Sequence, residues 1–298
     1  MGEDEGRARV AALPCWRGGI AAERLTGGLS NEIWKVTDDG GAHVVRFGRD
    51  YPFHHVFRDR EAMVARAAAA AGFGPAVEYA GPGVMVTAYL DARTWGAAEV
   101  AANPGRVGRL LREFHTRMGA GIEGAAFLFW PFHVVRDYAR TLRAGGSAHV
   151  GDLPVYLALN EALEAAQVPM PIVFGHHDLL PANFLETADG RLWLIDYEYA
   201  GFGTAMFDLA GAAANAGMDE AQAGALLAAY FGATPDGATR RAFDAMQVAA
   251  LLREAMWAMV SELHLNAPGV DYGAYTGENL TKLGAAKAAF SDRYGNLP

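Results

Sequence analysis

The sequence predicts an α+β fold of two lobes, with a small antiparallel sheet and one helix in residues 1–90 and a larger, mainly helical lobe in residues 91–298. Short segments typical of strands, separated by glycine turns, recur through the first 90 residues, with one helical segment among them. Beyond them, apolar residues recur at helical spacing. No proline-rich or low-complexity linker interrupts the chain, so we expect the lobes to share one compact body.

Composition and charge exclude several classes of protein. The chain has 298 residues, of which 52% are hydrophobic and 20% charged, and it can therefore bury a sizeable core. Its formal net charge of −9 argues against nucleic acid as a partner. The single cysteine, Cys15, excludes an internal disulfide or a cysteine-based zinc cluster. Without an apolar signal-peptide core or a bilayer-length apolar run, we expect a cytoplasmic protein with no membrane partner, and the oligomeric state stays open.

The first lobe is expected to contain five strands. Four of them follow the glycine turn of Leu25–Asn31 (LTGGLSN), and the fifth precedes it. The four are Glu32–Val36, His43–Phe47, Ala76–Tyr79 and Gly83–Leu90. A Gly-Gly turn lets backbone N–H groups approach phosphates without side-chain obstruction, although such a turn more commonly only closes a hairpin.

One helix of the first lobe begins near Arg58, continues to Ala71, and is ended by the sequence GFGP. Its Glu61 could pair with Arg46, which stands in the middle of the preceding strand, and such a pair can hold nucleotide phosphates. Alternatively, Glu61 is only a favourable charge at a helix N-terminus. We favour the ion pair.

The second lobe reads as a series of helices. In Arg106–Met118, apolar residues recur at helical spacing and predict one buried face. His115 in this helix is expected to be a hydrogen-bonded structural histidine rather than a catalytic group. Further helices are expected at Val134–Arg143, Leu153–Ala166, Phe207–Ala216, Glu220–Phe231, Thr239–Leu265 and Asn279–Tyr294.

The stretch Phe174–Asp208 carries the chemistry. Asp178 stands on a short loop, Asn183 follows, and Asp196 ends the apolar run Leu192–Ile195, which predicts a buried strand. The turn residues Ala188–Arg191 predict a hairpin between the loop and that strand. The hairpin would therefore bring two carboxylates and one amide to the same end of a small sheet.

Phosphoryl transfer requires this set of groups. One carboxylate orients and deprotonates a hydroxyl, while the asparagine and a second aspartate hold Mg²⁺ on the nucleotide phosphates. The H-x-D-x-x-x-x-N spacing from His176 to Asn183 is typical of the catalytic loop of kinase-like folds. Taken singly, such residues are commonly turn or cap residues. We do not expect His176 and His177 to bind one metal ion together, because adjacent residues on an extended loop point apart. We expect His176 to brace the loop by hydrogen bonds instead.

These motifs resemble the bacterial choline/ethanolamine kinases, within the aminoglycoside-phosphotransferase-like group of the protein-kinase-like fold. The resemblance covers about Leu13 to Tyr294. It is carried by LTGGLSNEIWKV, VVRFGRD, HHVFRDRE, GFGPAV, GHHDLLPANFL and LIDYEYAGFGTAMFDLA. The HHDLLPANF and IDYEYAG segments are specific to that family, whereas the glycine turn alone is weak evidence.

The resemblance implies roles for individual residues. Asp178 becomes the base, and Asn183 and Asp196 become magnesium ligands. Arg46, with Glu61 as its partner, takes the place of the phosphate-binding strand cation. The groups expected to contact the nucleotide phosphates are Gly27, Gly28, Ser30 and Asn31. The backbone at Ala88 and Leu90, just before the chain crosses to the second lobe, is expected to meet the adenine.

The resemblance also implies substrate contacts from Glu198, Tyr199 and Trp257. A quaternary ammonium is held by aromatic faces together with nearby carboxylates. Trp257 matches the first tryptophan of the family's W-x-x-W pair, but the second position is Val260, and a further acidic position is Asn215. Core packing of Trp257 and a structural ion pair of Glu198 are equally compatible with the sequence.

The expected function is that of an ATP- and Mg²⁺-dependent transferase, a small-molecule kinase that phosphorylates the hydroxyl of choline. The alternatives are ethanolamine, thiamine, an aminoglycoside or a sugar as acceptor, and, in another class, a catalytically silent nucleotide- or ligand-binding protein. A cramped, less aromatic pocket would favour ethanolamine, and an open acidic cleft an aminoglycoside. A protein kinase is disfavoured because Asp196 lies in Asp-Tyr-Glu rather than Asp-Phe-Gly.

Overall fold

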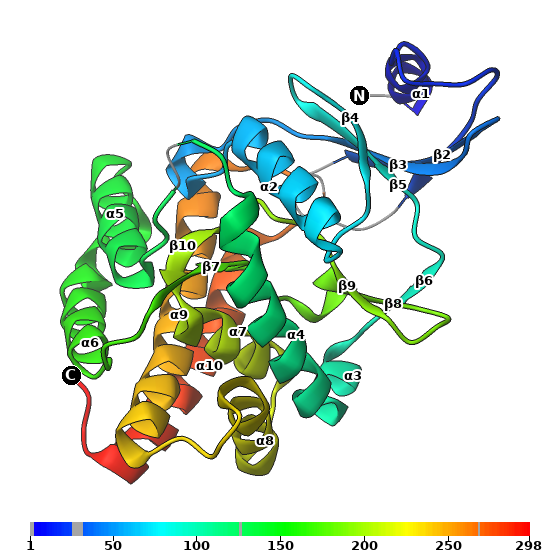
Figure 1. The fold of residues 1–298 in the computed structure, drawn as a ribbon. Helices are drawn as coiled ribbons and strands as arrows, with labels where there is room; N and C mark the ends of the chain where they lie inside the picture. Colours follow the sequence, from blue (N-terminus) through cyan, green and yellow to red (C-terminus); the bar gives the residue numbers. More distant parts are fainter. Residues whose placement is uncertain (1–2, 26–31, 125–126, 268) are drawn as a thin grey trace.

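The computed structural model describes residues 3–25, 32–124, 127–267 and 269–298, and begins with a five-stranded antiparallel sheet (Figure 1). Its strands are β1 (Ala21–Leu25), β2 (Glu32–Asp38), β3 (Gly41–Phe47), β4 (Val77–Gly81) and β5 (Val84–Ala88). They lie in the order β1-β2-β3-β5-β4, and each neighbouring pair is antiparallel. The predicted α+β class and the predicted sheet are confirmed.

One face of this sheet forms a small core of its own. Trp34 and Val45 pair across β2 and β3 and are fully buried, because alternate residues of each strand point to the same face. The short helix α1 (Glu3–Ala11) closes this core with Val10. The sequence prediction missed α1, whose residues are mostly polar and show almost no apolar periodicity.

Helix α2 (Arg58–Ala71) connects the sheet to the rest of the molecule. It contacts β4 on one side and the 3₁₀ helix η2 (Met118–Gly121) on the other. Its buried Val64 and Ala68 belong to the large core of the helical body and not to the small core of the sheet. As predicted, the helix ends at Gly72, whose φ of 79° is easily adopted only by glycine.

The helical body surrounds the long helix α9, which contacts α5, α6, α7 and α10 (Figure 1). Its helices are α3 (Ala97–Ala102), α4 (Pro104–Arg117), α5 (Pro131–Ala144), α6 (Leu153–Ala165), α7 (Ala205–Ala216), α8 (Glu220–Phe231), α9 (Gly237–His264) and α10 (Tyr272–Tyr294). Helix α10 begins earlier than the predicted Asn279, because the Asp271 side chain caps it by accepting the N–H of Ala274 at 2.9 Å. Among the described helices, none is long and apolar enough to cross a membrane.

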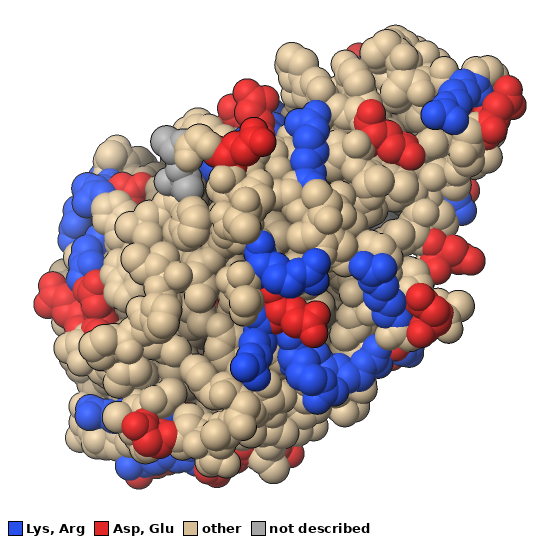
Figure 2. Space-filling model, viewed as in Figure 1, with Lys and Arg blue, Asp and Glu red and all other residues tan. Residues whose placement is uncertain are grey.

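Helix α4 shows how polar and apolar residues divide between core and surface. Val107, Leu111 and Phe114 are fully buried, as its helical spacing predicts. The arginines of this helix lie between those positions, and Figure 2 shows basic side chains gathered around α4 on the surface. The helix therefore presents a basic outer face although the chain as a whole is acidic.

Two small sheets position the stretch Phe174–Asp208, which contains the predicted site residues Asp178, Asn183 and Asp196. One pairs β7 (Ile172–Gly175) with β10 (Gly201–Thr204), and the other has the order β6 (Ala92–Thr94), β8 (Phe184–Thr187), β9 (Leu192–Leu194). The predicted hairpin is the β8–β9 pair, with Gly190 at a φ of 80° in its turn. The N–H of Leu194 donates to the carbonyl oxygen of Phe73 at 2.8 Å, so the hairpin is fixed to the end of α2. The sequence did not predict β6, β7 and β10, which are too short for a periodic pattern.

A glycine in α4 sets how closely that helix approaches α8. A Cβ atom at Gly108 would lie 2.5 Å from the carbonyl oxygen of Leu226 and 2.9 Å from the Cβ of Ala229. Gly108→Ala must therefore push the helices apart, and we expect it to lower the free energy of unfolding by about 1–3 kcal/mol in denaturant titrations. Gly224→Ala on α8 is the control, because nothing lies within 4 Å of its Cβ position and helix propensity favours alanine by about 1 kcal/mol. Equal effects of both changes would contradict this packing argument.

Candidate active site

The loop that carries Asp178 is held by one buried carboxylate, that of Asp208 at the start of α7. The backbone N–H groups of His176 and His177 each donate to one of its oxygens, both at 2.7 Å. His115 of α4 adds a third bond from Nε2 at 2.8 Å. Burial alone would raise the pKa of Asp208, but these bonds and the nearby histidines bring that pKa below its usual range. Asp208 is therefore an ionised anchor for the loop.

The histidines of this loop have structural roles. His176 donates from Nε2 to the carbonyl oxygen of Ile195 at 2.9 Å, and its Nδ1 accepts the N–H of Asp178 at 3.3 Å. The predicted bracing contacts of His176 are thus present, and they connect the loop to the end of β9. His115 is bonded on both ring nitrogens, to Asp208 and to the hydroxyl of Tyr230. Within the described part of the chain, no three His, Cys, Asp or Glu side chains are grouped to hold a metal ion.

His177 is buried in an apolar environment. Its ring stacks on Phe129 with centroids 4.4 Å apart, and its backbone has a φ of 63°. A Cβ atom at Gly175 or Gly203 would lie within 3 Å of its Nε2, so the glycines of β7 and β10 make room for the ring. Burial lowers the pKa of His177 to about 4, and the ring is therefore neutral at neutral pH.

Asn183 and Asp196 supply the oxygen atoms that could hold a divalent cation. Asn183 donates from Nδ2 to the carbonyl oxygen of Asp178 at 2.8 Å, which leaves its Oδ1 as an acceptor. Asp196 follows β9 with a φ of 69°, a backbone conformation that redirects its side chain at the end of the strand. One amide oxygen and one carboxylate suit Mg²⁺, which prefers oxygen ligands and shares them with nucleotide phosphates.

A chain of ion pairs joins the first sheet, α2 and the end of β9. Arg46 of β3 pairs with Glu61 of α2, as predicted, and donates from Nη1 to Asp196 Oδ1 at 2.5 Å. Arg58 bonds from its own Nη1 to Glu61 at 2.6 Å and to Glu198 at 2.9 Å. The arrangement places two arginines between three carboxylates, so that like charges are kept apart.

Glu198 is part of this network. Burial and the neighbouring Asp196 raise the pKa of its carboxyl, while Arg58 and Arg46 oppose that rise. Its bond to Arg58 is the structural ion pair that the sequence left as one of two interpretations. Glu198 does not line the pocket beside Asp178.

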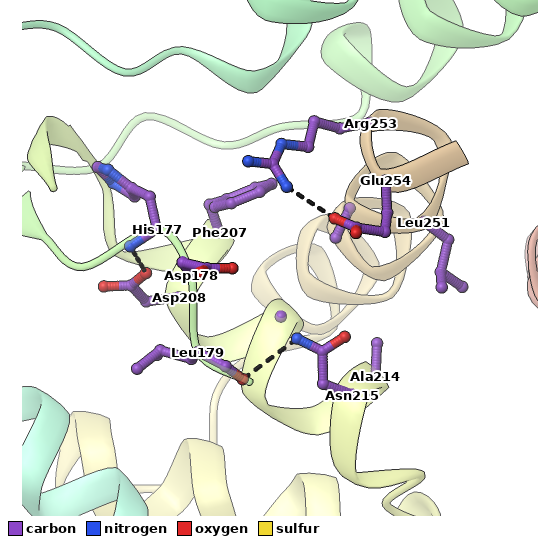
Figure 3. A pocket seen from close by; sticks show the side chains of 12 residues that line it. His177, Asp178, Leu179, Phe207, Asp208, Ala214, Asn215, Leu251, Arg253 and Glu254 are labelled. Atoms are coloured by element: carbon purple, nitrogen blue, oxygen red, sulfur yellow. Dashed lines mark hydrogen bonds and ion pairs between the residues drawn. The ribbon is translucent and has the colours of Figure 1, made fainter. Parts of the chain in front are cut away.

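A pocket beside Asp178 is formed by the loop that carries this residue, by α7 and by α9 (Figure 3). Figure 3 shows Asp178, Asn215, Arg253 and Glu254 facing one another across it. Burial raises the pKa of Asp178 well above its usual range, and the positive charge of Arg253 opposes that shift. The remaining lining is largely aliphatic, with Phe207 the only phenylalanine, tyrosine or tryptophan among the described residues that form it.

The two aromatic residues expected at the substrate are not in this lining. Trp257 is 8% exposed, stacks on His54 with centroids 4.8 Å apart, and donates from Nε1 to the Tyr199 hydroxyl at 2.8 Å. Tyr199 is 5% exposed. The core-packing interpretation of Trp257 therefore describes its surroundings in this structure, and the reason is that other side chains of the protein already cover both rings.

Of the expected nucleotide contacts, Ala88 and Leu90 belong to the described residues. Gly27, Gly28, Ser30 and Asn31 lie outside the described residues. Ala88 ends β5, and Leu90 follows at the point where the chain leaves the sheet. The N–H groups of Ala88 and Tyr89 donate to the carbonyl oxygens of Ala76 and Ala42, both at 2.9 Å. This segment is thus held against the sheet at the expected position of the adenine.

Sequence reasoning missed four residues that shape the site. They are Arg58, Asp208, Arg253 and Glu254. A signal existed for the last two, because an Arg-Glu pair interrupts the otherwise apolar segment Val248–Val260 of α9. Charged residues are rarely buried unless they are paired, so their presence on an apolar helix indicates a site.

A family model described as the phosphotransferase enzyme family matches residues 21–245. Among solved structures, a choline/ethanolamine kinase family protein from Mesorhizobium loti is 30% identical, with a TM-score of 0.77 over 98% of this chain and 97% of that one. The choline kinase LicA from Streptococcus pneumoniae is 19% identical, with a TM-score of 0.75 over 96% of this chain and 99% of that one. LicA has also been solved in complex with AMP.

A curated relative, a probable ethanolamine kinase from Arabidopsis thaliana, is 26% identical over 205 residues. That match covers 64% of this chain and 54% of the relative. The chain therefore spans about half the length of this curated relative, whereas it spans almost the whole of the two bacterial structures.

The anchoring role of Asp208 is testable with Asp208→Asn. An amide keeps the size of the carboxylate but removes its charge and offers N–H groups toward three N–H donors. We expect the free energy of unfolding to fall by about 2–4 kcal/mol in denaturant titrations. The control is Asp236→Asn, because Asp236 only caps α9 by accepting the N–H of Thr239, a position where Asn and Asp are about equally good. A loss no larger than that of the control would contradict the anchor.

The buried neutral state of His177 predicts how stability depends on pH. The unfolded chain binds a proton at this ring below about pH 6.5, whereas the folded protein binds it only below about pH 4. Because the unfolded state binds more protons in this window, stability is lost as the pH falls from 6.5 to 4. Urea titrations across this range should show a smaller loss for His177→Gln than for the unchanged protein, and parallel losses would argue against a neutral, buried His177.

Proposed function

Because the chain belongs to the phosphotransferase enzyme family, and within it to the choline/ethanolamine kinase family, we propose that it transfers the γ-phosphoryl group of ATP to the hydroxyl of a small amino-alcohol. The observation that carries this proposal is the meeting of Asp178, Asn183, Asp196 and Arg46 at the carboxyl end of the β8–β9 hairpin and the loop before it. Their side chains are the set that phosphoryl transfer requires.

Asp178 is the proposed base. Its carboxylate accepts the proton of the acceptor hydroxyl while that oxygen forms a bond to the γ-phosphorus and the bond to the β-phosphate oxygen breaks, which gives the phosphate ester and ADP. Asp208 fixes the loop through the N–H groups of His176 and His177, so the base is held in place before the acceptor arrives. Most of the catalytic effect would then come from positioning.

Asn183 and Asp196 would hold Mg²⁺, and Arg46, oriented by Glu61, would contact the nucleotide phosphates. The bound cation would neutralise charge on those phosphates. The oxygen donors described above fit this cation, and the AMP complex of LicA supports a nucleotide site on this fold. The glycine turn with Ser30 and Asn31 remains part of the proposal as a phosphate contact.

Two amino-alcohols are the leading acceptors. Choline is the acceptor that the sequence motifs favour, and ethanolamine is the alternative for a cramped, less aromatic pocket. The pocket beside Asp178 has such a lining, with Phe207 as its aromatic residue among the described ones. The presence of all three catalytic side chains counts against a silent binding protein.

The proposal is tested by Mg²⁺- and ATP-dependent release of ADP with purified protein and a panel of choline, ethanolamine, thiamine and two aminoglycosides. We expect turnover with an amino-alcohol, and a fall in kcat of about 10²–10⁴-fold for Asp178→Asn, because the amide cannot accept the proton. Asp189→Asn is the matched control, since Asp189 lies in the turn of the same hairpin and bonds to Thr187 and Arg191.

Turnover with thiamine or an aminoglycoside alone would keep the kinase chemistry and reject an amino-alcohol acceptor. Measurable ATP binding without turnover on any acceptor, or turnover unaffected by Asp178→Asn, would reject the proposed function. The second result would also remove Asp178 from the mechanism.

A further inference from the structure

We propose that Arg253 and Glu254, neighbours on α9, make the acceptor site select a primary ammonium over a quaternary one, so that ethanolamine-type alcohols are preferred to choline. The inference rests on the proposed function, because it concerns which amino-alcohol enters the pocket beside Asp178. Two observations carry it: the aromatic faces are covered, and a carboxylate that can accept hydrogen bonds faces the pocket.

Arg253 already occupies the aromatic face that a quaternary ammonium would need. Its guanidinium carbon lies 4.6 Å from the ring centroid of Tyr199 and 5.9 Å from that of Phe129. The side chain is only 4% exposed, and of its nitrogens only Nη1 has a hydrogen-bond acceptor, while Nε and Nη2 have none. The guanidinium is therefore stabilised largely by ring faces, and a second cation would meet both a covered ring and a like charge.

The ring of Trp257, the second aromatic residue expected at the substrate, is also covered by other side chains. The Trp257 ring stacks on His54 at an interplanar angle of 20°, and its N–H donates to the Tyr199 hydroxyl. Arg253 and Trp257 are four residues apart on α9, so they share one face of the helix. On that face the arginine lines the pocket, whereas the tryptophan does not.

Glu254 supplies what a primary ammonium needs. Its Oε2 accepts from Arg253 Nη1 at 2.7 Å and its Oε1 accepts from the Tyr275 hydroxyl at 2.8 Å, so the carboxylate is oriented from two sides. The side chain is 22% exposed and lines the pocket. Each carboxylate oxygen can accept a further hydrogen bond, and a primary ammonium has three N–H donors, whereas a trimethylammonium has none.

Asn215 offers a second acceptor across the pocket. Its Nδ2 donates to the carbonyl oxygen of Leu179 at 3.1 Å, which leaves Oδ1 to accept (Figure 3). The family that the sequence resembles has an acidic residue at this position. In the present chain the pocket gains its carboxylate from Glu254 on the neighbouring helix instead.

The carboxyl groups of the lining outnumber its arginine, because Asp178, Asp208 and Glu254 lie there with Arg253. Both oxygens of Asp208 are bound by backbone N–H groups, which leaves Glu254 and Asn215 as acceptors for an ammonium. Attraction of a cation is therefore common to ethanolamine and choline, and the choice between them rests on the covered rings and on the hydrogen-bond acceptors.

The test compares kcat/KM for ethanolamine and choline, measured by ADP release at saturating Mg-ATP. We expect the unchanged protein to favour ethanolamine by at least about tenfold. Glu254→Gln should lower the ethanolamine-to-choline ratio by about 10–100-fold, because it replaces a charged acceptor of the ammonium N–H groups by a neutral amide that offers one acceptor oxygen instead of two. Arg253→Met should lower the ratio by about 3–30-fold, because it uncovers the face of Tyr199. Ratios cancel any loss of activity that is common to both acceptors.

Arg240→Met is the matched control. Arg240 also lies on α9 and pairs with a carboxylate, Asp244, at 2.9 Å, but it is outside the pocket lining. Its ratio should stay within about twofold of the unchanged protein. Glu254→Gln hardly changes the shape of the side chain, so this variant tests the selectivity even if Arg253→Met does not fold.

The outcomes separate this inference from the proposed function. A preference of the unchanged protein for choline, or ratios that neither substitution changes, overturns the inference and leaves the kinase intact. If no amino-alcohol is turned over, the proposed acceptor class has failed, and calorimetric binding of ethanolamine and choline in the presence of Mg²⁺ and a non-hydrolysable ATP analogue still tests the selectivity. Ethanolamine binding that is weakened by Glu254→Gln supports the inference, and equal binding of both amines rejects it.

Discussion

The hydrogen bonds between the Asp208 carboxylate and the backbone N–H groups of His176 and His177 are the constraint on which the site depends. Two successive N–H groups that point to one side chain leave the loop little conformational freedom, and His177 accordingly has a positive φ. Burying the carboxylate makes each bond stronger and makes its loss costly. Because Asp208 lies in the first turn of α7 and also binds His115 of α4, the position of the Asp178 loop is set by the packing of the helical body.

Local patterns were sufficient for the β8–β9 hairpin, because turn residues and apolar runs occur within short segments. The Arg46–Glu61 pair was expected instead by analogy with the strand cation and helix carboxylate of kinases. The β7–β10 pair was not predictable in the same way, since strands of four residues show no period. Gly175 and Gly203 make room for the His177 ring, and this packing requirement exists only in the folded protein. The role of Asp208 could not be predicted from the sequence for a related reason. Its partners are amide groups, which every residue possesses.

The residues expected to bind the substrate show the limit of assigning residue roles from sequence motifs. The sequence predicts two aromatic rings near the site, those of Tyr199 and Trp257, and both rings do lie near it. Whether a ring face is available depends on what covers it, and here the cover for Tyr199 comes from Arg253, one helical turn before Trp257. Whether an aromatic residue can contribute to binding thus depends on a neighbouring residue, here Arg253, whose role the sequence motifs do not indicate.

The division of the core has a mechanical consequence. The apolar side of α2 is packed with the helical body, while the sheet keeps a small core of its own with α1. The sheet nevertheless reaches the large core through partly buried Val77 of β4 and Met85 of β5, and the Arg46–Glu61 ion pair ties it to α2. A tilt of the sheet relative to the helical body would therefore move Arg46 relative to Glu61 and to its second partner, Asp196.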